Sequence, residues 1–371
     1  MPTPAITQII VPSGACAWHV TGHSLARRLL ADERIGMSHP QPAKASWYSR
    51  DDVSGRPRGA AGQEYADHAG WRSAMLRVFS TTRFVARQPA IEAQAQALCR
   101  QIHRMAPPVD FNAEFSVPYC SRVIMELLDV PGSMIDDAMR WTEQGATADD
   151  IGLSLTGMRS LLGYATELVE QRGTAPPPDV IGQLVALNAA RERPDLGAVI
   201  KLVAGMLAFG RETPASALST TLALLLENPT DYARVRDDPR LRSSAIEEAL
   251  RMFSPPAATP HGLLRYAHTE LDADGTAIAA GDMMLVDIAR ANFDASVFAR
   301  PDVFTPDRNP NPHVTFGSGF YLCNFARLAR IELAAALDAV LTTFPTLRLG
   351  KPLAYNTRLR TRSVTELVVS W

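Results

Sequence analysis

The segment His313–Glu332, HVTFGSGFYLCNFARLARIE, is the stretch around which the rest of the chain can be placed. Its run Phe316–Gly319 predicts a loop, because glycine reaches backbone angles that are closed to residues with a Cβ. Leu328 and Ile331 then begin the apolar face of a helix. Cys323 therefore lies where a loop enters a helix, and the N–H groups and positive dipole end of a helix N-terminus favour a thiolate over a thiol.

Cys323 by itself leaves three interpretations open. A sulfur in this position suits a nucleophile, a metal ligand or an inert core residue. Free cysteine is among the most buried residue types, so the residue and its two glycines alone favour the core. The rest of the chain has to decide between the three.

The composition is that of an ordinary soluble globular protein. The chain has 371 residues, 46% hydrophobic content and a formal net charge of -2, so it can bury a large core, and no basic excess indicates a nucleic-acid partner. The four cysteines form no CxxC pair, which argues against a disulfide framework or zinc site and predicts a reducing, cytoplasmic location. No signal peptide is recognisable, and charges interrupt the most apolar stretch, 199–226, so no membrane span is expected.

The hydrophobic periodicity predicts a mainly α-helical chain with a minor β component and no composition break between domains. Short strands are expected at 6–10 and 15–20, a helix at 24–31, and a long loop at 37–62 that is either a binding lid or disordered. Pro and Gly clusters then separate helices at 65–79, 88–105, 113–128, 132–145, 155–171, 178–190, 196–226, 230–236 and 239–252. Further strands are expected at 263–266, 269–271, 283–288, 346–349 and 363–370, and a helix from the cysteine to about 344.

Glu248 and Arg251 form a first candidate cluster. They lie at i and i+3 of an expected helix, so they share one face and can pair. Most such pairs are solvated surface charges that contribute about 0.2–0.5 kcal/mol. A structural or functional role of this pair is favoured because a Phe-Ser-Pro-Pro sequence and then the strands follow it.

A second cluster lies inside the longest expected helix, 196–226. Pro214 removes a helical hydrogen bond at a cost of roughly 3 kcal/mol, and Gly210 weakens the helix by about 1 kcal/mol. Their place beside Glu212 and Thr213 predicts a local opening whose freed carbonyls hold water, with the acid and the hydroxyl as a proton relay. The alternative is a helix that simply breaks near residue 210.

A third cluster is His68 with Arg72, at i and i+4 of a helix that also carries Trp71. A His/Arg pair on one face suits an anion such as a carboxylate or phosphate. An exposed polar helix face is the alternative.

In combination and in this order, the clusters resemble a cytochrome P-450 of the soluble bacterial type, from about residue 15 to the C-terminus. The sequence FGSGFYLC is similar to the family's haem-binding loop, with Cys323 in the place of the axial thiolate ligand. Glu248 and Arg251 match the ExxR pair, and Arg308, in FTPDR, matches the meander arginine that completes this structural triad. The sequence FGRET resembles the acid–alcohol segment of the oxygen-binding helix, and His68 with Arg72 fits the HxxxR motif.

The resemblance implies a single P-450 domain over 1–371, with a β-rich part at about 1–62, a helical part at about 63–252, and β, meander and cysteine-loop parts at about 253–371. Haem b (iron protoporphyrin IX) would lie between the oxygen-binding helix and the cysteine helix. The residues that the resemblance places around this haem, apart from Cys323, are His68, Arg72, Arg265, His313, Phe316, Gly317, Tyr321 and Phe325. Proton delivery falls to Glu212 and Thr213, and the substrate pocket to Ala204, Ala208, Phe209 and the loops near 40–66, 257–263 and 358–362.

The function that the resemblance implies is oxidation of a small organic or peptide-like metabolite with O₂ and two externally supplied electrons. A ferredoxin or flavodoxin type donor with its reductase would supply the electrons, and no nucleic acid or membrane is implied as a partner. The outcome is hydroxylation or aromatic coupling in specialised metabolism, since fold does not choose between them.

The chain departs from the family pattern at three positions. Tyr321 stands where a His or Arg usually helps to hold a haem propionate, so it either does this with its hydroxyl or leaves the propionate to other residues. Phe325 stands where Gly is usual, and Pro214 where a small or hydroxylic residue is usual. Two alternative functions therefore stay open: a catalytically weak haem protein that only carries a ligand, and a non-redox helical scaffold with a buried Cys323.

Overall fold

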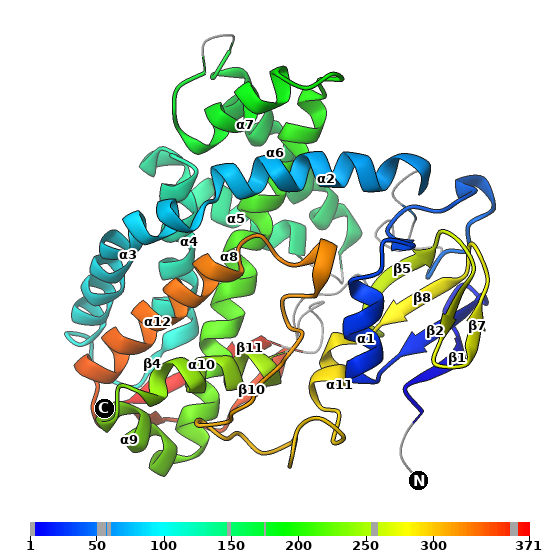
Figure 1. The fold of residues 1–371 in the computed structure, drawn as a ribbon. Coiled ribbons are helices and arrows are strands. Elements are labelled where there is room, and N and C mark those ends of the chain that lie inside the picture. The colour runs from blue at the N-terminus through cyan, green and yellow to red at the C-terminus, as the bar shows by residue number, and fades with distance from the viewer. Residues whose placement is uncertain are drawn as a thin grey trace. The chain divides into compact units, whose positions relative to one another are not determined.

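A computed structural model describes residues 4–49, 57, 61–146, 150–173, 176–253, 259–356 and 363–371. The chain forms two compact units, each built from two distant segments: unit 1 is Met1–Ser73 with Glu247–Ala326, and unit 2 is Ala74–Ile246 with Arg327–Trp371. Figure 1 shows the elements of both, and each unit is described by itself. The single domain over 1–371 with its three consecutive parts stays a prediction.

Unit 1 contains a five-stranded sheet in the order β1-β2-β8-β5-β3. Its strands are β1 (Ile6–Ile10), β2 (Cys16–Val20), β3 (Ile35–Gly36), β5 (Leu263–Ala267) and β8 (Met283–Val286). β2 and β8 are parallel, and the other neighbours are antiparallel. The β6–β7 hairpin, Leu271–Ala273 with Thr276–Ile278, turns at Asp274 and Gly275, both at positive φ, as is usual for an Asp-Gly sequence in a tight turn.

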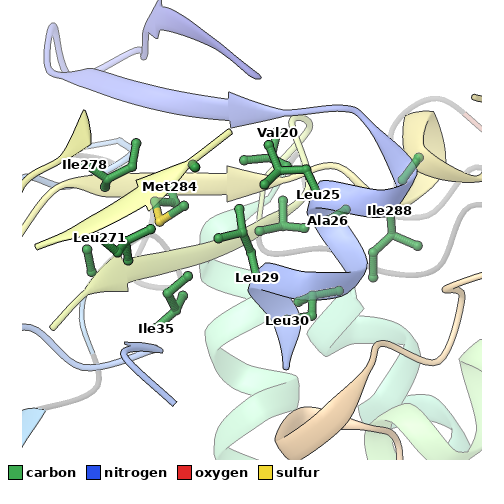
Figure 2. Close-up of a cluster of buried hydrophobic side chains, with 14 of the residues drawn as sticks. Val20, Leu25, Ala26, Leu29, Leu30, Ile35, Leu271, Ile278, Met284 and Ile288 are labelled. Carbon is green, nitrogen blue, oxygen red and sulfur yellow. The ribbon is translucent and has the colours of Figure 1, made fainter. Parts of the chain in front are cut away.

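Both faces of this sheet are covered. Figure 2 shows α1 (His23–Leu30) packing Leu25, Ala26 and Leu29 against Val20 and Met284. The opposite face packs in a second cluster that includes Met283 and Leu285. All four residues of β8 are therefore buried, since successive side chains point to opposite covered faces.

The remaining regular elements of unit 1 are short. They are η1 (Pro42–Lys44), α11 (Ile288–Asn292) and η5 (Gly319–Tyr321). Three longer helices, α2 (Ala61–Val78), α10 (Leu241–Met252) and α12 (Ala326–Thr343), run through the boundary between the units. The strand expected at 283–288 ends two residues early, because Asp287 caps α11 by accepting from the Arg290 N–H.

Unit 2 is mainly helical. Its helices are α3 (Thr81–Ile102), α4 (Val117–Leu127), α5 (Ile135–Ala146), α6 (Ile151–Glu170), α7 (Val180–Ala189), α8 (Leu196–Glu227) and α9 (Pro229–Asp237), with η3 (Asn112–Ser116) and η4 (Gly132–Met134) leading into α4 and α5. Two small sheets add β4 (Val109–Asp110), β9 (Arg348–Leu349) and β12 (Val368–Ser370), and β10 (Ala354–Asn356) with β11 (Ser363–Glu366). The mainly α fold with a minor β part is confirmed.

Two helix predictions are corrected. α3 begins at Thr81 and not at 88, since the Ser80 hydroxyl caps its N-terminus and Pro89 lies inside the helix. α8 runs without interruption through Pro214, so the alternative of a helix that breaks near residue 210 is wrong. Among the described residues, the structure contains no helix both long and apolar enough to cross a membrane.

Candidate active site

The segment Phe316–Cys323 of unit 1, called the cysteine loop below, contains two glycines that determine its backbone path. Gly317 and Gly319 have φ values of +78° and +59°, which residues with a Cβ rarely adopt. A Cβ on Gly319 would lie 2.5 Å from the Cα of Ala31, so α1 also requires glycine here. The Cys323 N–H donates to the Phe316 carbonyl at 2.8 Å and closes the loop.

Cys323 lies at the end of this loop, directly before α12, which begins at Ala326. Its side chain is exposed, whereas Cys99 and Cys120 are buried. The interpretation of Cys323 as an inert core residue is therefore wrong. An exposed thiol at a helix entry remains suited to bind a metal as a thiolate.

A buried cluster of charged residues, Glu248, Arg251 and Arg308, lies in unit 1. Glu248 and Arg251 are both 0% exposed. The Glu248 carboxylate accepts from Arg251 Nε at 2.8 Å and Nη2 at 2.9 Å, and from Arg308 Nε at 2.8 Å. The Thr305 N–H and the Asn311 amide donate to the same carboxylate. The three residues expected as a structural triad are thus brought together.

Arg251 also anchors the backbone that leads to the cysteine loop. Its guanidinium donates to the carbonyls of Asn292 and Pro301, both at 2.8 Å. The Asn292 side chain in turn accepts from the Val314 N–H at 2.8 Å and donates to Thr315 Oγ1 at 2.9 Å. Sequence reasoning missed Asn292, because an Asn in a short helix gives no signal of a partner 22 residues away.

His313, a predicted propionate contact, has protein partners at both ring nitrogens. Nε2 lies 3.0 Å from Glu247 Oε2, and Nδ1 accepts from the Thr315 N–H at 3.3 Å. These contacts fix the ring at the start of the loop. The propionate contact of His313 stays a prediction.

Arg72 reaches the cysteine loop from α2. Its Nη1 donates to the Leu322 carbonyl at 2.9 Å and to the Phe320 carbonyl at 3.1 Å, and lies 3.4 Å from the Asn324 side chain. Its place beside the loop that carries Cys323 fits the expected role near the haem. The backbone of His68 is in the same helix, but its side chain lies outside the described residues, so the His/Arg pair stays a prediction.

Tyr321 and Arg265 lie against each other beside the loop. The Arg265 Cζ is 5.0 Å from the centre of the Tyr321 ring, and Arg265 Nη1 donates to the Leu264 carbonyl. The Tyr321 hydroxyl donates to Glu64 at 2.5 Å. Burial and this carboxylate raise the pKa of Tyr321, so the phenol stays protonated. Glu64 was missed by sequence reasoning, where the only available signal was an acidic residue in a first helical turn.

The aromatic residues of the loop flank the cysteine. Phe316 and Phe325 are half-buried, and the Phe316 ring lies 6.1 Å from the His313 ring. Their contact with haem, like that of Gly317, stays a prediction.

The acid–alcohol segment lies in the middle of α8, in unit 2. Glu212 and Thr213 are half-buried, and Pro214 provides no N–H for the Gly210 carbonyl. A Cβ on Gly210 would lie 2.6 Å from Ile124 Cγ1, so the glycine lets α4 approach α8 closely. The neighbouring Arg211 is buried, and burial lowers its pKa. The proton relay stays a prediction.

The predicted pocket residues on α8 differ in exposure. Ala204 and Ala208 are half-buried, whereas Phe209 is 61% exposed. Of the loops expected around the pocket, 50–56, 58–60, 257–258 and 358–362 lie outside the described residues.

Comparison with known proteins adds a relationship over nearly the whole chain. A family model described as Cytochrome P450 matches residues 170–353. The chain is 31% identical to vitamin D3 dihydroxylase of Streptomyces griseolus, over 98% of this chain and 90% of that one, and 31% identical to nocardicin C N-oxygenase of Nocardia uniformis subsp. tsuyamanensis, over 98% and 92%. The cytochrome P450 hydroxylase of the leinamycin pathway of Streptomyces atroolivaceus S-140 has a similar structure, with a TM-score of 0.88 and 26% identity over 100% of this chain and 94% of that one.

Proposed function

The chain belongs to the cytochrome P450 family, and from that premise we propose that it inserts oxygen into a small organic or peptide-like specialised metabolite. It is a haem-thiolate monooxygenase with haem b as its cofactor. The relatives named above are a dihydroxylase, an N-oxygenase and a hydroxylase. Their names favour oxygen insertion over the aromatic coupling that the sequence left open.

The residues of unit 1 fit a haem. Cys323 offers an exposed sulfur before a helix, and two cations, Arg72 and Arg265, lie beside the same loop. Cys323 would ligate the iron, and the two arginines would compensate the propionates, because buried carboxylates need charged or hydrogen-bonding partners. Bound in this way, haem supplies O₂ activation, since a thiolate ligand favours O–O cleavage. The exposed Cys323 in its closed loop is the observation that carries the proposal.

In unit 2, Glu212 and Thr213 are proposed to move the protons that oxygen reduction consumes. The Glu212 carboxyl would take up a proton from solvent, and Thr213 Oγ1 would donate a proton toward the haem side of α8. Water would connect the two groups, because side chains at i and i+1 of a helix do not face each other. The Gly210 carbonyl, which has no helical N–H partner at Pro214, would hold a water in this relay. This role follows from the order of the residues on α8 and from their partial exposure.

Electrons are proposed to come from a ferredoxin or flavodoxin type protein with its reductase, in the cytoplasm. The formal charge of -2 gives no reason to add nucleic acid as a partner. Phe209 is proposed to contact an apolar part of the substrate, since a side chain of this size is 61% exposed on α8.

The ligand role of Cys323 is tested by reducing the purified protein and adding CO. We expect a Soret band of the thiolate type in the wild type and in Cys16→Ala, which removes the other exposed thiol of unit 1. Cys323→Ala should lose the band. A colourless wild type would leave the non-redox scaffold as the better explanation.

The proton relay is tested with Thr213→Ala under turnover with electron donor. We expect slower product formation and more hydrogen peroxide. Without Thr213, oxygen that has taken up two electrons from the donor receives its two protons from water and leaves as H₂O₂ before the O–O bond is cleaved. Unchanged product and peroxide would refute the relay. A protein that binds haem and ligand but forms no product with any electron donor would instead be the ligand carrier.

The substrate class is tested by titrating aromatic and peptide metabolites into the ferric protein. A true substrate is expected to shift the haem from low to high spin. Phe209→Ala should weaken the binding of apolar candidates, and Lys201→Ala is a control at an exposed position of the same helix, outside the predicted pocket.

A further inference from the structure

Glu64 is a buried carboxylate that neither the family resemblance nor the proposed mechanism uses. Its side chain is 10% exposed, in the first turn of α2. It accepts from the Met37 N–H at 2.8 Å, from the Ser38 N–H at 2.7 Å and from the Ser38 hydroxyl. His268 Nε2 lies 3.4 Å from Glu64 Oε2. Burial opposes its ionisation, but the donated hydrogen bonds outweigh burial and lower the pKa of Glu64 far below its usual value.

The surrounding backbone is fitted to this carboxylate. A Cβ on Gly36 would lie 2.4 Å from Glu64 Oε2 and 2.5 Å from His268 Cε1. Any larger residue at position 36 would therefore displace the carboxylate or the imidazole. Two backbone N–H groups, a hydroxyl and a glycine together hold an anion at one fixed place in unit 1.

The remaining partner of Glu64 is Tyr321, two residues before Cys323. A phenol has a single O–H, and here it donates to Glu64 Oε1 at 2.5 Å. The same proton is not available to a propionate, and a propionate oxygen close to Glu64 would meet a second negative charge. Of the two roles open to Tyr321, holding a propionate with its hydroxyl or leaving the propionate to other residues, this contact favours the second.

The ring of Tyr321 contacts the Arg265 cation, whereas its hydroxyl contacts Glu64. The Arg265 guanidinium lies over the ring at 5.0 Å, the range of a cation–π contact. Arg265 is 7% exposed, and its guanidinium contacts both this ring and the Leu264 carbonyl. The contacts run in series from Glu64 through Tyr321 to Arg265.

We propose that Glu64 is a positioning residue of the haem site, which acts through Tyr321 and Arg265. Its carboxylate accepts the hydrogen bond of the phenol, fixes the ring beside the cysteine loop, and so holds the Arg265 guanidinium for a haem propionate. Tyr321 is then a platform and does not itself bind the propionate. The inference rests on the haem binding of the proposed function.

The test uses the holoprotein and four variants: Glu64→Gln, Tyr321→Phe, the double variant, and Glu270→Gln as a control at an exposed glutamate of unit 1. Haem loss is measured by transfer to apomyoglobin. We expect both single variants to lose haem about tenfold faster than the wild type. The double variant should be no faster than either single, because the contacts act in series, and Glu270→Gln should match the wild type.

The midpoint potential of the haem gives a second readout that loosened packing alone does not move. In Tyr321→Phe, the Arg265 cation is less firmly held against the propionate, so the oxidised state is favoured. We expect up to a tenfold change in the ratio of oxidised to reduced haem, which is 59 mV for one electron. In Tyr321→Phe, the Glu64 carboxylate keeps the hydrogen bonds from Met37 and Ser38. This variant is therefore expected to fold and can still test the proposal if Glu64→Gln does not fold.

Three results would overturn the proposal. Faster haem loss in Tyr321→Phe with wild-type behaviour in Glu64→Gln would mean that Tyr321 binds the propionate itself. Additive effects in the double variant would mean that the two residues act independently. An unchanged midpoint potential in Tyr321→Phe would mean that these contacts only pack the site and have no electrostatic effect on the haem. Failure of the proposed function is separate, since it would appear in the wild type as a missing ferrous–CO band.

Discussion

Replacing Glu248 with glutamine tests whether the buried charge cluster holds the cysteine loop in place. Glutamine keeps the shape of the side chain but loses its charge, and its amide N–H groups face the donors of Arg251 and Arg308. Arg251 is 0% exposed and would be left without its counter-charge. Breaking a buried ion pair in this way costs about 3–5 kcal/mol. That is a large share of a total stability of about 5–15 kcal/mol.

The assay is urea unfolding followed by far-UV circular dichroism. With an m value near 3 kcal/mol/M, the expected loss moves the midpoint down by about 1–2 M. The haem-loaded fraction should fall with it, since Arg251 and Asn292 connect the cluster to the backbone before the loop.

A control for Glu248→Gln is Asp274→Asn, which removes the charge of an ion pair with Arg28 whose side chains are 51% and 54% exposed. Asn tolerates the positive φ of position 274, and an exposed pair contributes about 0–1 kcal/mol. The reasoning is refuted if Glu248→Gln unfolds within about 0.5 kcal/mol of the wild type and retains its haem.

Three further predictions concern unit 2. Glu332 is fully buried, and burial raises its pKa well above the ordinary value of 4.5. The stability that its protonated form contributes is therefore complete below about pH 4.5 and declines as the pH rises. Glu332→Met should raise the free energy of unfolding at pH 7 by about 1–3 kcal/mol and by less at pH 5, and an equal gain at both pH values would contradict this. Gly210→Ala should destabilise by about 1–3 kcal/mol because its Cβ would lie 2.6 Å from Ile124 Cγ1, whereas Gly205→Ala, with no atom within 4 Å of its Cβ, should gain about 0.5–1 kcal/mol. Pro214→Ala restores a helical N–H and should raise the thermal midpoint; a lower midpoint would mean that the proline has a packing role in α8.

Local chemistry made much of the fold predictable from the sequence. The strand at Ile6–Ile10 was predicted with its observed bounds, and the long helix was predicted within one residue of its C-terminus. Both carry strong periodic patterns over their whole length. The prediction failed at α3, which was expected to begin at residue 88 although Ser80 caps the helix eight residues earlier. A proline inside a helix and one at its first turn give the same local signal.

The sequence by itself determined which residue types stand at which spacing: a cysteine after a glycine loop, an acid and an arginine one turn apart, and an acid–alcohol pair in a long helix. These features depend on residues within one helical turn or one loop, so they can be read before folding. Only the tertiary structure decided which distant residues contact these features. Glu64 and Tyr321 are 257 residues apart in the chain, and Arg251 reaches a carbonyl 50 residues away. Contacts across such distances form only when the chain has folded, because local sequence does not fix where a distant segment returns. The position of Cys323 after a glycine loop could therefore be identified from the sequence, whereas the residues that contact its loop could not.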